Sequence, residues 1–190
     1  MSFEQCQSVA SLMAGFTKTW FIAGGWAIDL FIGNETRVHK DIEFAVFRKD
    51  QLYLKNYLIE WDFKIAIKAE LHTWENELLE LPVHEIHASN KLNGEEIEIL
   101  LNETKGEYWT FRRDSRISYP LNSVWSYSET GIPYLNPEIV LLYKAKNSRE
   151  KDHQDFMIIK DYLDYQQKQR LFYALELHEP THKWLQFLSF

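Results

Sequence analysis

Two carboxylates stand two residues apart in the segment Asp41-Ile42-Glu43-Phe44-Ala45-Val46-Phe47. The alternation of acidic and apolar residues predicts a strand over 41–47, in which Asp41 and Glu43 share the face opposite the core. Two acids on one face repel each other, and a divalent cation such as Mg²⁺, which prefers carboxylate oxygens, would offset that repulsion. The alternative is a solvated strand end with two acids that bind nothing.

A glycine pair lies upstream, between the apolar run 20–23 and the apolar segment 26–32. Glycine lets the chain turn sharply and lets a phosphate approach the backbone N–H groups. The predicted helix 26–32 would then offer free N–H groups at its start to an anion. A plain strand-to-helix turn would use the same Gly24 and Gly25. The order strand, glycine pair, helix and acidic strand favours a phosphate and metal site.

A third acidic group lies in the segment Glu95-Glu96-Ile97-Glu98-Ile99-Leu100-Leu101. If this predicted strand lies beside 41–47, either Glu96 or Glu98 completes a cluster of three carboxylates. Such a cluster with two Mg²⁺ ions suits phosphoryl or nucleotidyl transfer, and the third acid can take a proton from the attacking hydroxyl. An exposed strand face is the alternative for both residues.

The elements that must position these groups alternate between strand and helix up to Gly131 and become helical after Pro137. An Asn93-Gly94 turn between two apolar runs predicts a hairpin. We expect helices at 3–18, 26–32, 50–60, from Pro137, 151–165, 168–176 and 181–188, and strands at 41–47, 63–68, 83–88 and 95–101, with weaker ones at 108–112 and 124–127.

Charge and cysteine content exclude several classes of protein. The 190 residues hold 21 Lys and Arg against 28 Asp and Glu, a formal net charge of -7. This balance argues against a broad nucleic-acid-binding surface and suits a cationic ligand. The single cysteine, Cys6, excludes an intrachain disulfide and a cysteine-rich zinc site. We see no pattern of a signal peptide or a membrane span, and we expect a cytoplasmic protein.

The segment around the glycine pair and the first acidic strand carries a family resemblance. It comprises Phe21-Ile22-Ala23-Gly24-Gly25-Trp26-Ala27-Ile28-Asp29, then Gly33, Thr36-Arg37, His39 and Asp41-Ile42-Glu43. This resembles the polymerase-β-type nucleotidyltransferase superfamily, above all the branch that adenylylates aminoglycosides at the 2″ hydroxyl and the related lincosamide enzymes. The similarity is looser through 98–103 and returns at 131–135, 137–144 and 151–156.

The resemblance implies an α+β fold: a minimal nucleotidyltransferase core over 1–133, with a mixed sheet and packed helices, and a small helical subdomain over 134–190. It implies Mg²⁺-dependent transfer of a nucleoside monophosphate from ATP or another NTP to a hydroxyl of a small, cationic or polyhydroxylated acceptor, such as an aminoglycoside- or lincosamide-like antibiotic. By position, Gly24 and Gly25 would hold the triphosphate, Asp41 and Glu43 the metals, and Glu98 would be the third acid.

Two positions depart from the family pattern. The related enzymes have Asp where this chain has Glu43 and Glu98, and glutamate places its carboxylate one methylene farther from the backbone. Two other functions therefore stay open: a catalytically weak nucleotide-binding or regulatory homologue, and a toxin-like enzyme that modifies a macromolecule.

Further charged residues have two possible interpretations, a role in the site and a structural or surface role. Arg37 would reach a phosphate or brace the acid cluster, or be a partner in a surface salt bridge. Lys144 would contact the NTP phosphates or lie on a solvated helix face. Asp29 would brace the glycine loop through hydrogen bonds or be an acid on the helix surface. Asp152 and Asp155, three residues apart on a predicted helix, would position substrate amines or fix the C-terminal part to the core.

The run Phe111-Arg112-Arg113-Asp114-Ser115-Arg116 is the densest basic segment of the middle of the chain. It predicts either a local phosphate-binding patch or a solvated turn.

Overall fold

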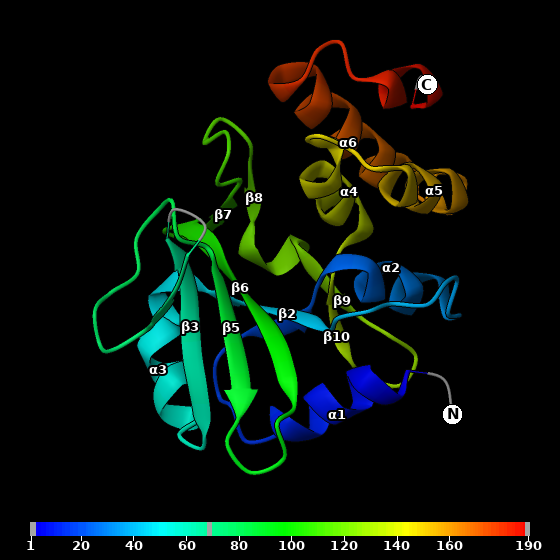
Figure 1. Ribbon diagram of the computed structural model, residues 1–190. Coiled ribbons are helices and arrows are strands. Elements are labelled where there is room, and N and C mark those ends of the chain that lie inside the picture. Colours follow the sequence, from blue (N-terminus) through cyan, green and yellow to red (C-terminus); the bar gives the residue numbers. More distant parts are fainter. Residues whose placement is uncertain (1–2, 68–69, 189–190) are drawn as a thin grey trace.

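The computed structural model describes residues 3–67 and 70–188 (Figure 1). Lys68, the last residue of the predicted strand 63–68, lies outside this range. The α-helices are α1 Glu4–Leu12, α2 Gly24–Ile32, α3 Gln51–Tyr57, α4 Pro137–Ala145, α5 Glu150–Ile159 and α6 Tyr165–His178. The strands are β1 Trp20–Ile22, β2 Glu43–Phe47, β3 Trp61–Ile67, β4 Glu70–Thr73, β5 Glu85–Asn90, β6 Glu96–Lys105, β7 Tyr108–Thr110, β8 Ser118–Pro120, β9 Trp125–Tyr127 and β10 Pro133–Leu135.

The strands form one mixed sheet in the order β4-β3-β5-β6-β2-β1-β10-β9. The pairs β2–β6 and β1–β10 are parallel, and the other neighbours are antiparallel. The predicted hairpin around Asn93-Gly94 is confirmed as the β5–β6 pair. Together with the helices, this sheet confirms the predicted α+β class.

The start of β6 shows the alternation of buried and more exposed residues that the sequence predicts. On β6, Ile97 and Ile99 are buried, whereas Glu96 and Glu98 lie on the opposite face, exposed and half-buried respectively. On β2, Phe44 and Val46 are fully buried in the same core cluster. The acids of β6 therefore lie opposite its core face, whereas β2 is buried on both faces beyond Glu43, since Ala45 and Phe47 also belong to the core.

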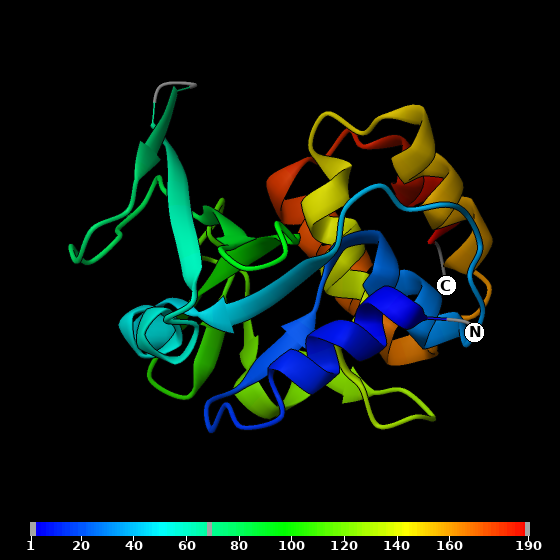
Figure 2. The same ribbon diagram turned by 60° about the horizontal axis from the view of Figure 1, so that its bottom comes forward.

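Three helices after β10 form the C-terminal part. Figures 1 and 2 show α4, α5 and α6 gathered on one side of the molecule, while the β3–β4 hairpin projects on the other. The helix α2 packs against α4 and α5, which connects the glycine pair with the C-terminal helices. The helical character predicted after Pro137 is confirmed. The division at residue 133 stays a prediction; β10, at 133–135, pairs with β1 and β9.

Some boundaries differ from those predicted, for local reasons. The helix predicted over 151–165 ends at Ile159, and α6 begins at Tyr165 because the Asp164 side chain accepts a hydrogen bond of 2.7 Å from the Gln167 N–H. The segment predicted as a helix at 181–188 is a short 3₁₀ helix, Lys183–Phe187. Over the described residues, no helix has the length and apolar character needed to cross a membrane.

Candidate active site

The carboxylate of Glu43 lies directly over the first turn of α2. Gly24 opens this helix, two residues earlier than predicted, with a φ of 60° that favours glycine. A Cβ built on Gly24 would lie 1.5 Å from Oε2 of Glu43, so no other residue leaves room for this carboxylate. The positive end of the helix and the carboxylate thus meet at one point.

The register of the parallel pair β2–β6 places Glu98 beside Glu43. The two are Cα partners, and the Glu98 N–H donates to the Ile42 carbonyl at 3.1 Å. Glu96, which has the same parity, pairs instead with Ser89 of β5. The tertiary structure therefore shows which of the two acids neighbours the first acidic strand: it is Glu98.

Asp41 precedes β2 instead of opening it. The strand predicted over 41–47 begins at Glu43, and Asp41 is exposed in the bend before it. It lines a cavity of about 410 Å³ on the sheet surface together with Glu96, Glu98 and His87. The charge of Asp41 still acts on Glu43 and Glu98, because it raises the pKa of both.

Burial is the largest cause of a raised pKa at both glutamates. At Glu43, the positive charge of Lys144 opposes this effect, and the charge of Glu85 adds to it. At Glu98, the charges of Glu85 and Glu43 add to the effect of burial. Burial and nearby negative charge thus disfavour the ionised forms of Glu43 and Glu98, which a bound cation would stabilise.

A histidine connects two of these acids. His87 Nε2 lies 3.1 Å from Oε1 of Glu85, and its Nδ1 lies 4.0 Å from Oε1 of Glu98. One possible ligand atom from each of the three residues lies within 4.8 Å of the others, a spacing that permits metal binding. Sequence reasoning did not find Glu85 and His87, because only the β5–β6 register places them beside Glu98.

The segment before the acidic strand is fixed to α2 by a buried acid. Asp29 accepts hydrogen bonds from Thr36 Oγ1 at 2.6 Å and from His39 Nε2 at 2.7 Å. A Cβ on Gly25 would lie 2.5 Å from both Arg37 Nη2 and His39 Cε1. The second glycine thus leaves room for this segment. Asp29 fixes residues 36–39 to α2, and its bracing of the glycine loop itself stays a prediction.

Arg37 and Lys144 meet at one buried carboxylate. Arg37 donates to Asp155 from Nε at 2.9 Å and from Nη2 at 3.1 Å. Lys144 Nζ lies 3.0 Å from the same carboxylate and 3.1 Å from Asp152. Of the two interpretations of Asp155, the bracing one is therefore confirmed: it joins α5 to α4 and to the segment before β2.

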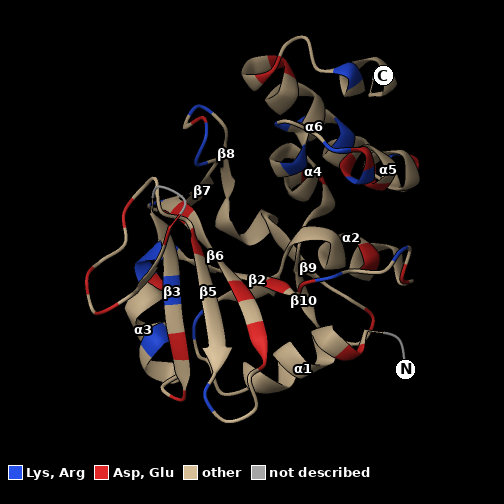
Figure 3. Cartoon of the chain, viewed as in Figure 1, with Lys and Arg blue, Asp and Glu red and all other residues tan. Residues whose placement is uncertain are grey.

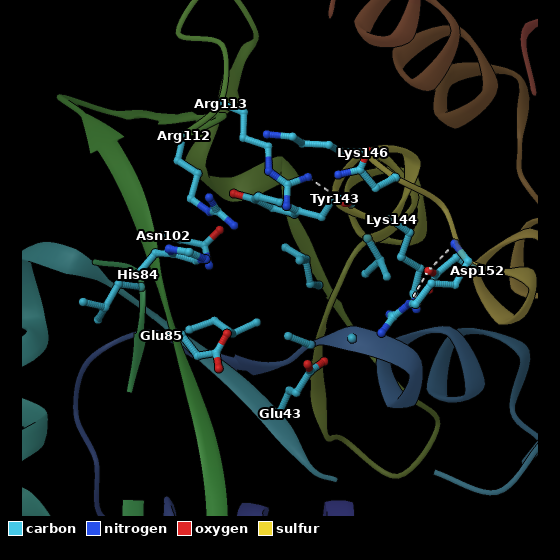
Figure 4. A pocket seen from close by; sticks show the side chains of 18 residues that line it. Glu43, His84, Glu85, Asn102, Arg112, Arg113, Tyr143, Lys144, Lys146 and Asp152 are labelled. Atoms are coloured by element: carbon cyan, nitrogen blue, oxygen red, sulfur yellow. Dashed lines mark hydrogen bonds and ion pairs between the residues drawn. The ribbon is translucent and has the colours of Figure 1, made fainter. Parts of the chain in front are cut away.

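The largest group of site residues lines a cavity of about 410 Å³ between the sheet and α4. Figure 4 shows Glu43 and Glu85 on one side of this cavity and Arg112 and Arg113 on the other. Gly24 and Lys144 also line it, whereas Asp41, Glu98, Gly25 and Arg37 do not. The full lining is Ala23, Gly24, Glu43, His84, Glu85, Leu100, Leu101, Asn102, Arg112, Arg113, Leu135, Val140, Tyr143, Lys144, Lys146, Asn147, Arg149 and Asp152.

The basic run at 111–116 is divided between the cavity and the solvent. Arg112 and Arg113 are half-buried and line the cavity, whereas Arg116 is exposed and pairs with Asp114 at 2.6 Å. Figure 3 shows basic residues on this turn and acidic residues along β6 and at the start of β2. The solvated-turn interpretation is thus wrong for the first two arginines.

Solved structures of similar fold are known. The lincosamide antibiotic adenylyltransferase LnuA, solved with lincomycin bound, is 19% identical, with a TM-score of 0.57 over 84% of this chain and 97% of that chain. ANT(2'')-Ia in complex with adenylyl-2''-tobramycin is 11% identical, with a TM-score of 0.61 over 91% and 98%. At these identities the likeness concerns the fold. A search of the curated proteins finds no match.

A family model decides the relationship. The model of the aminoglycoside-2''-adenylyltransferases matches residues 5–159, which include the glycine pair, both acidic strands and the helices α4 and α5. The chain therefore belongs to the aminoglycoside-2''-adenylyltransferase family of antibiotic nucleotidyltransferases and is an enzyme of the nucleotidyltransferase type.

Proposed function

We propose that this enzyme transfers a nucleoside monophosphate from an Mg²⁺-bound NTP, with ATP foremost, to a hydroxyl of a small antibiotic. The observation that carries the proposal is the position of the Glu43 carboxylate above Gly24, at the start of α2 and beside Glu98. This arrangement supports the proposal, because the carboxylates would hold a metal beside a helix start that would bind phosphate.

The donors present fit magnesium. Asp41, Glu43 and Glu98 would hold it through carboxylate oxygens, the ligands that this hard cation prefers. The missing side chain of Gly24 provides the room that the longer glutamate at position 43 requires. When bound, the metal would neutralise phosphate charge and lower the pKa of the attacking hydroxyl.

The chain's own groups would divide the remaining work. The N–H groups of Gly24 and Gly25 at the start of α2 would face the triphosphate, and Lys144 would add a positive charge beside them. Arg37 would act as a positioning residue through Asp155, which also receives Lys144. Glu98 would accept the proton of the attacking hydroxyl, because the β2–β6 register places it beside Glu43.

Two observations support an antibiotic as acceptor. The family model describes aminoglycoside adenylyltransferases, and two enzymes of similar fold were solved with lincomycin and with adenylyl-2''-tobramycin. The net charge of -7 also suits a cationic acceptor such as an aminoglycoside. The same charge disfavours nucleic acid as acceptor.

The test uses purified protein, Mg²⁺, each of the four NTPs and a panel of aminoglycosides and lincosamides, with mass spectrometry to detect a nucleotidyl adduct. We expect an adduct with the wild type, none after Glu43→Gln or addition of EDTA, and an unchanged yield with the matched control Glu129→Gln, an exposed acid in a turn. Equal yields from wild type and Glu43→Gln would refute the site. Absence of any adduct would refute the acceptor class.

A further inference from the structure

The turn between β7 and β8 projects two arginines into the cavity. Phe111, just before them, is fully buried and packs edge-on against Tyr143 at 5.0 Å and His178 at 5.2 Å between ring centroids. The Phe111 N–H also donates to the Ile117 carbonyl at 2.9 Å. These contacts hold the turn against α4 and α6, so the directions of Arg112 and Arg113 are set by a packed scaffold.

The guanidinium groups of Arg112 and Arg113 both lie near the aromatic ring of Tyr143. Their central carbons lie 5.5 Å (Arg112) and 5.6 Å (Arg113) from the centre of its ring, within range of a cation–π contact. Arg113 Nη1 also donates to the Tyr143 carbonyl at 2.7 Å. Burial lowers the pKa of each arginine, and the charge of Arg113 lowers that of Arg112 further. Two like charges are thus held together at a free-energy cost.

The cations of this cavity fall into two groups. Lys144 and Arg149 are paired with Asp152, at 3.1 and 2.8 Å. Within the described part of the chain, no carboxylate lies within ion-pair distance of Arg112, Arg113 or Lys146. These three therefore form a site of concentrated positive charge without a protein counterion, which an anion with several oxygens would satisfy.

The position of this cationic group relative to Glu43 suggests what the anion is. Figure 4 shows Arg112, Arg113 and Lys146 across the cavity from Glu43 and Glu85. A ligand that reaches from the carboxylates to the arginines must present a metal-bound anion at one end and further negative charge at the other. A chain of phosphates has this form, and guanidinium groups match phosphate oxygens geometrically.

We propose that Arg112 and Arg113, assisted by Lys146, bind the β- and γ-phosphates of the NTP and the pyrophosphate that leaves. This rests on the proposed function. In that reaction the acceptor oxygen bonds to the α-phosphorus, while the bond from this phosphorus to the oxygen shared with the β-phosphate breaks. The electron pair remains on pyrophosphate, whose increased charge the two arginines stabilise, and the hydroxyl proton passes to Glu98.

The test measures binding of Mg²⁺-pyrophosphate, Mg²⁺-ATP and AMP by calorimetry. We expect Arg112→Gln and Arg113→Gln each to weaken pyrophosphate and ATP binding about tenfold or more, the loss typical of one hydrogen bond to a charged group, and to leave AMP binding unchanged. Arg116→Gln, from the exposed end of the same turn, is the matched control. Unchanged pyrophosphate affinity in both variants, or an equal loss for AMP, would overturn the proposal.

Thermal unfolding separates binding from folding, because Arg113 also supports the turn through Tyr143. If Arg113→Gln unfolds at a lower temperature than the wild type, pyrophosphate binding is compared in Arg113→Lys and Arg112→Gln instead. The proposal then requires that Arg112→Gln still loses pyrophosphate affinity. The two proposals also fail separately. Loss of pyrophosphate binding in the variants without any wild-type adduct would refute the acceptor class and leave this site standing. Adduct formation by the wild type, together with unchanged pyrophosphate affinity in the arginine variants, would refute the arginine site and leave the proposed function standing.

Discussion

Replacement of Gly24 by alanine tests the geometry on which the site depends. The new Cβ would lie 1.5 Å from Oε2 of Glu43, whereas real Cβ atoms essentially never approach closer than 3.0 Å. To reach a distance of 3.0 Å from the new Cβ instead of 1.5 Å, the carboxylate must move by 1.5 Å or more. A misplacement of about 1 Å can reduce a rate about 100-fold, so we expect a loss of at least that size in kcat.

The backbone effect of this substitution must be separated from the steric one. Gly24 has a φ of 60°, and alanine there costs about 1–2 kcal/mol of folding free energy. Gly33 is the matched control, because its φ is 81° and a Cβ there meets nothing within 4 Å. Both Gly24→Ala and Gly33→Ala should lower the unfolding temperature by about 2–4 °C per kcal/mol lost.

The assay compares initial rates of adduct formation with thermal unfolding for both variants and the wild type. We expect similar unfolding temperatures for the two variants, near-normal kcat for Gly33→Ala and a large loss for Gly24→Ala. If Gly24→Ala turns over as fast as Gly33→Ala, the carboxylate does not need its position above α2, and the reasoning about the site is refuted.

Three further predictions concern other parts of the site. Glu98→Gln should lower kcat about 10²- to 10⁴-fold, as expected for loss of a general base, whereas Glu96→Gln on the same strand face should leave initial rates nearly unchanged; equal effects would contradict the β2–β6 register. Burial raises the pKa of Asp152, but hydrogen bonds from Arg149 and other contacts lower it to about 2, below its value in the unfolded chain. The stability it contributes is therefore present above the unfolded pKa and lost as the pH falls toward 2, so urea unfolding should show a smaller loss over this acid range in Asp152→Asn than in the wild type. Arg37→Gln should lower the free energy of unfolding by about 2 kcal/mol through loss of its hydrogen bonds to a buried carboxylate, with little change in KM for the NTP; a large rise in KM without loss of stability would show that Arg37 contacts phosphate directly.

Local patterns in the sequence determined the strands and helices that carry the site. Alternation identified the apolar face of β2 and β6, and the glycine pair identified the start of α2, since these signals arise from neighbouring residues. Of the three-residue strands, β7 and β9 were predicted only as weaker strands, and β8 and β10 were not predicted, because three residues carry little periodicity. Their place in the sheet depends on partners distant in the sequence.

The choice between alternatives, by contrast, required the tertiary structure. Glu96 and Glu98 have the same parity, and only the parallel register with β2 places Glu98 beside Glu43. No local pattern around Asp155 shows whether it binds substrate or has a structural role. Only the folded chain brings Arg37 to it, across a separation of 118 residues.

The glycine pair, Asp41 and Glu43 could be identified as site candidates from the sequence by itself, because their signal comes from residues that are close along the chain. The cationic side of the cavity was decided by packing alone. Arg112 and Arg113 line the same cavity as Glu43 because Phe111 and Tyr143 hold their turn over it, whereas Arg116 in the same run lies in solvent. Contacts between distant segments, which no local pattern records, make this difference.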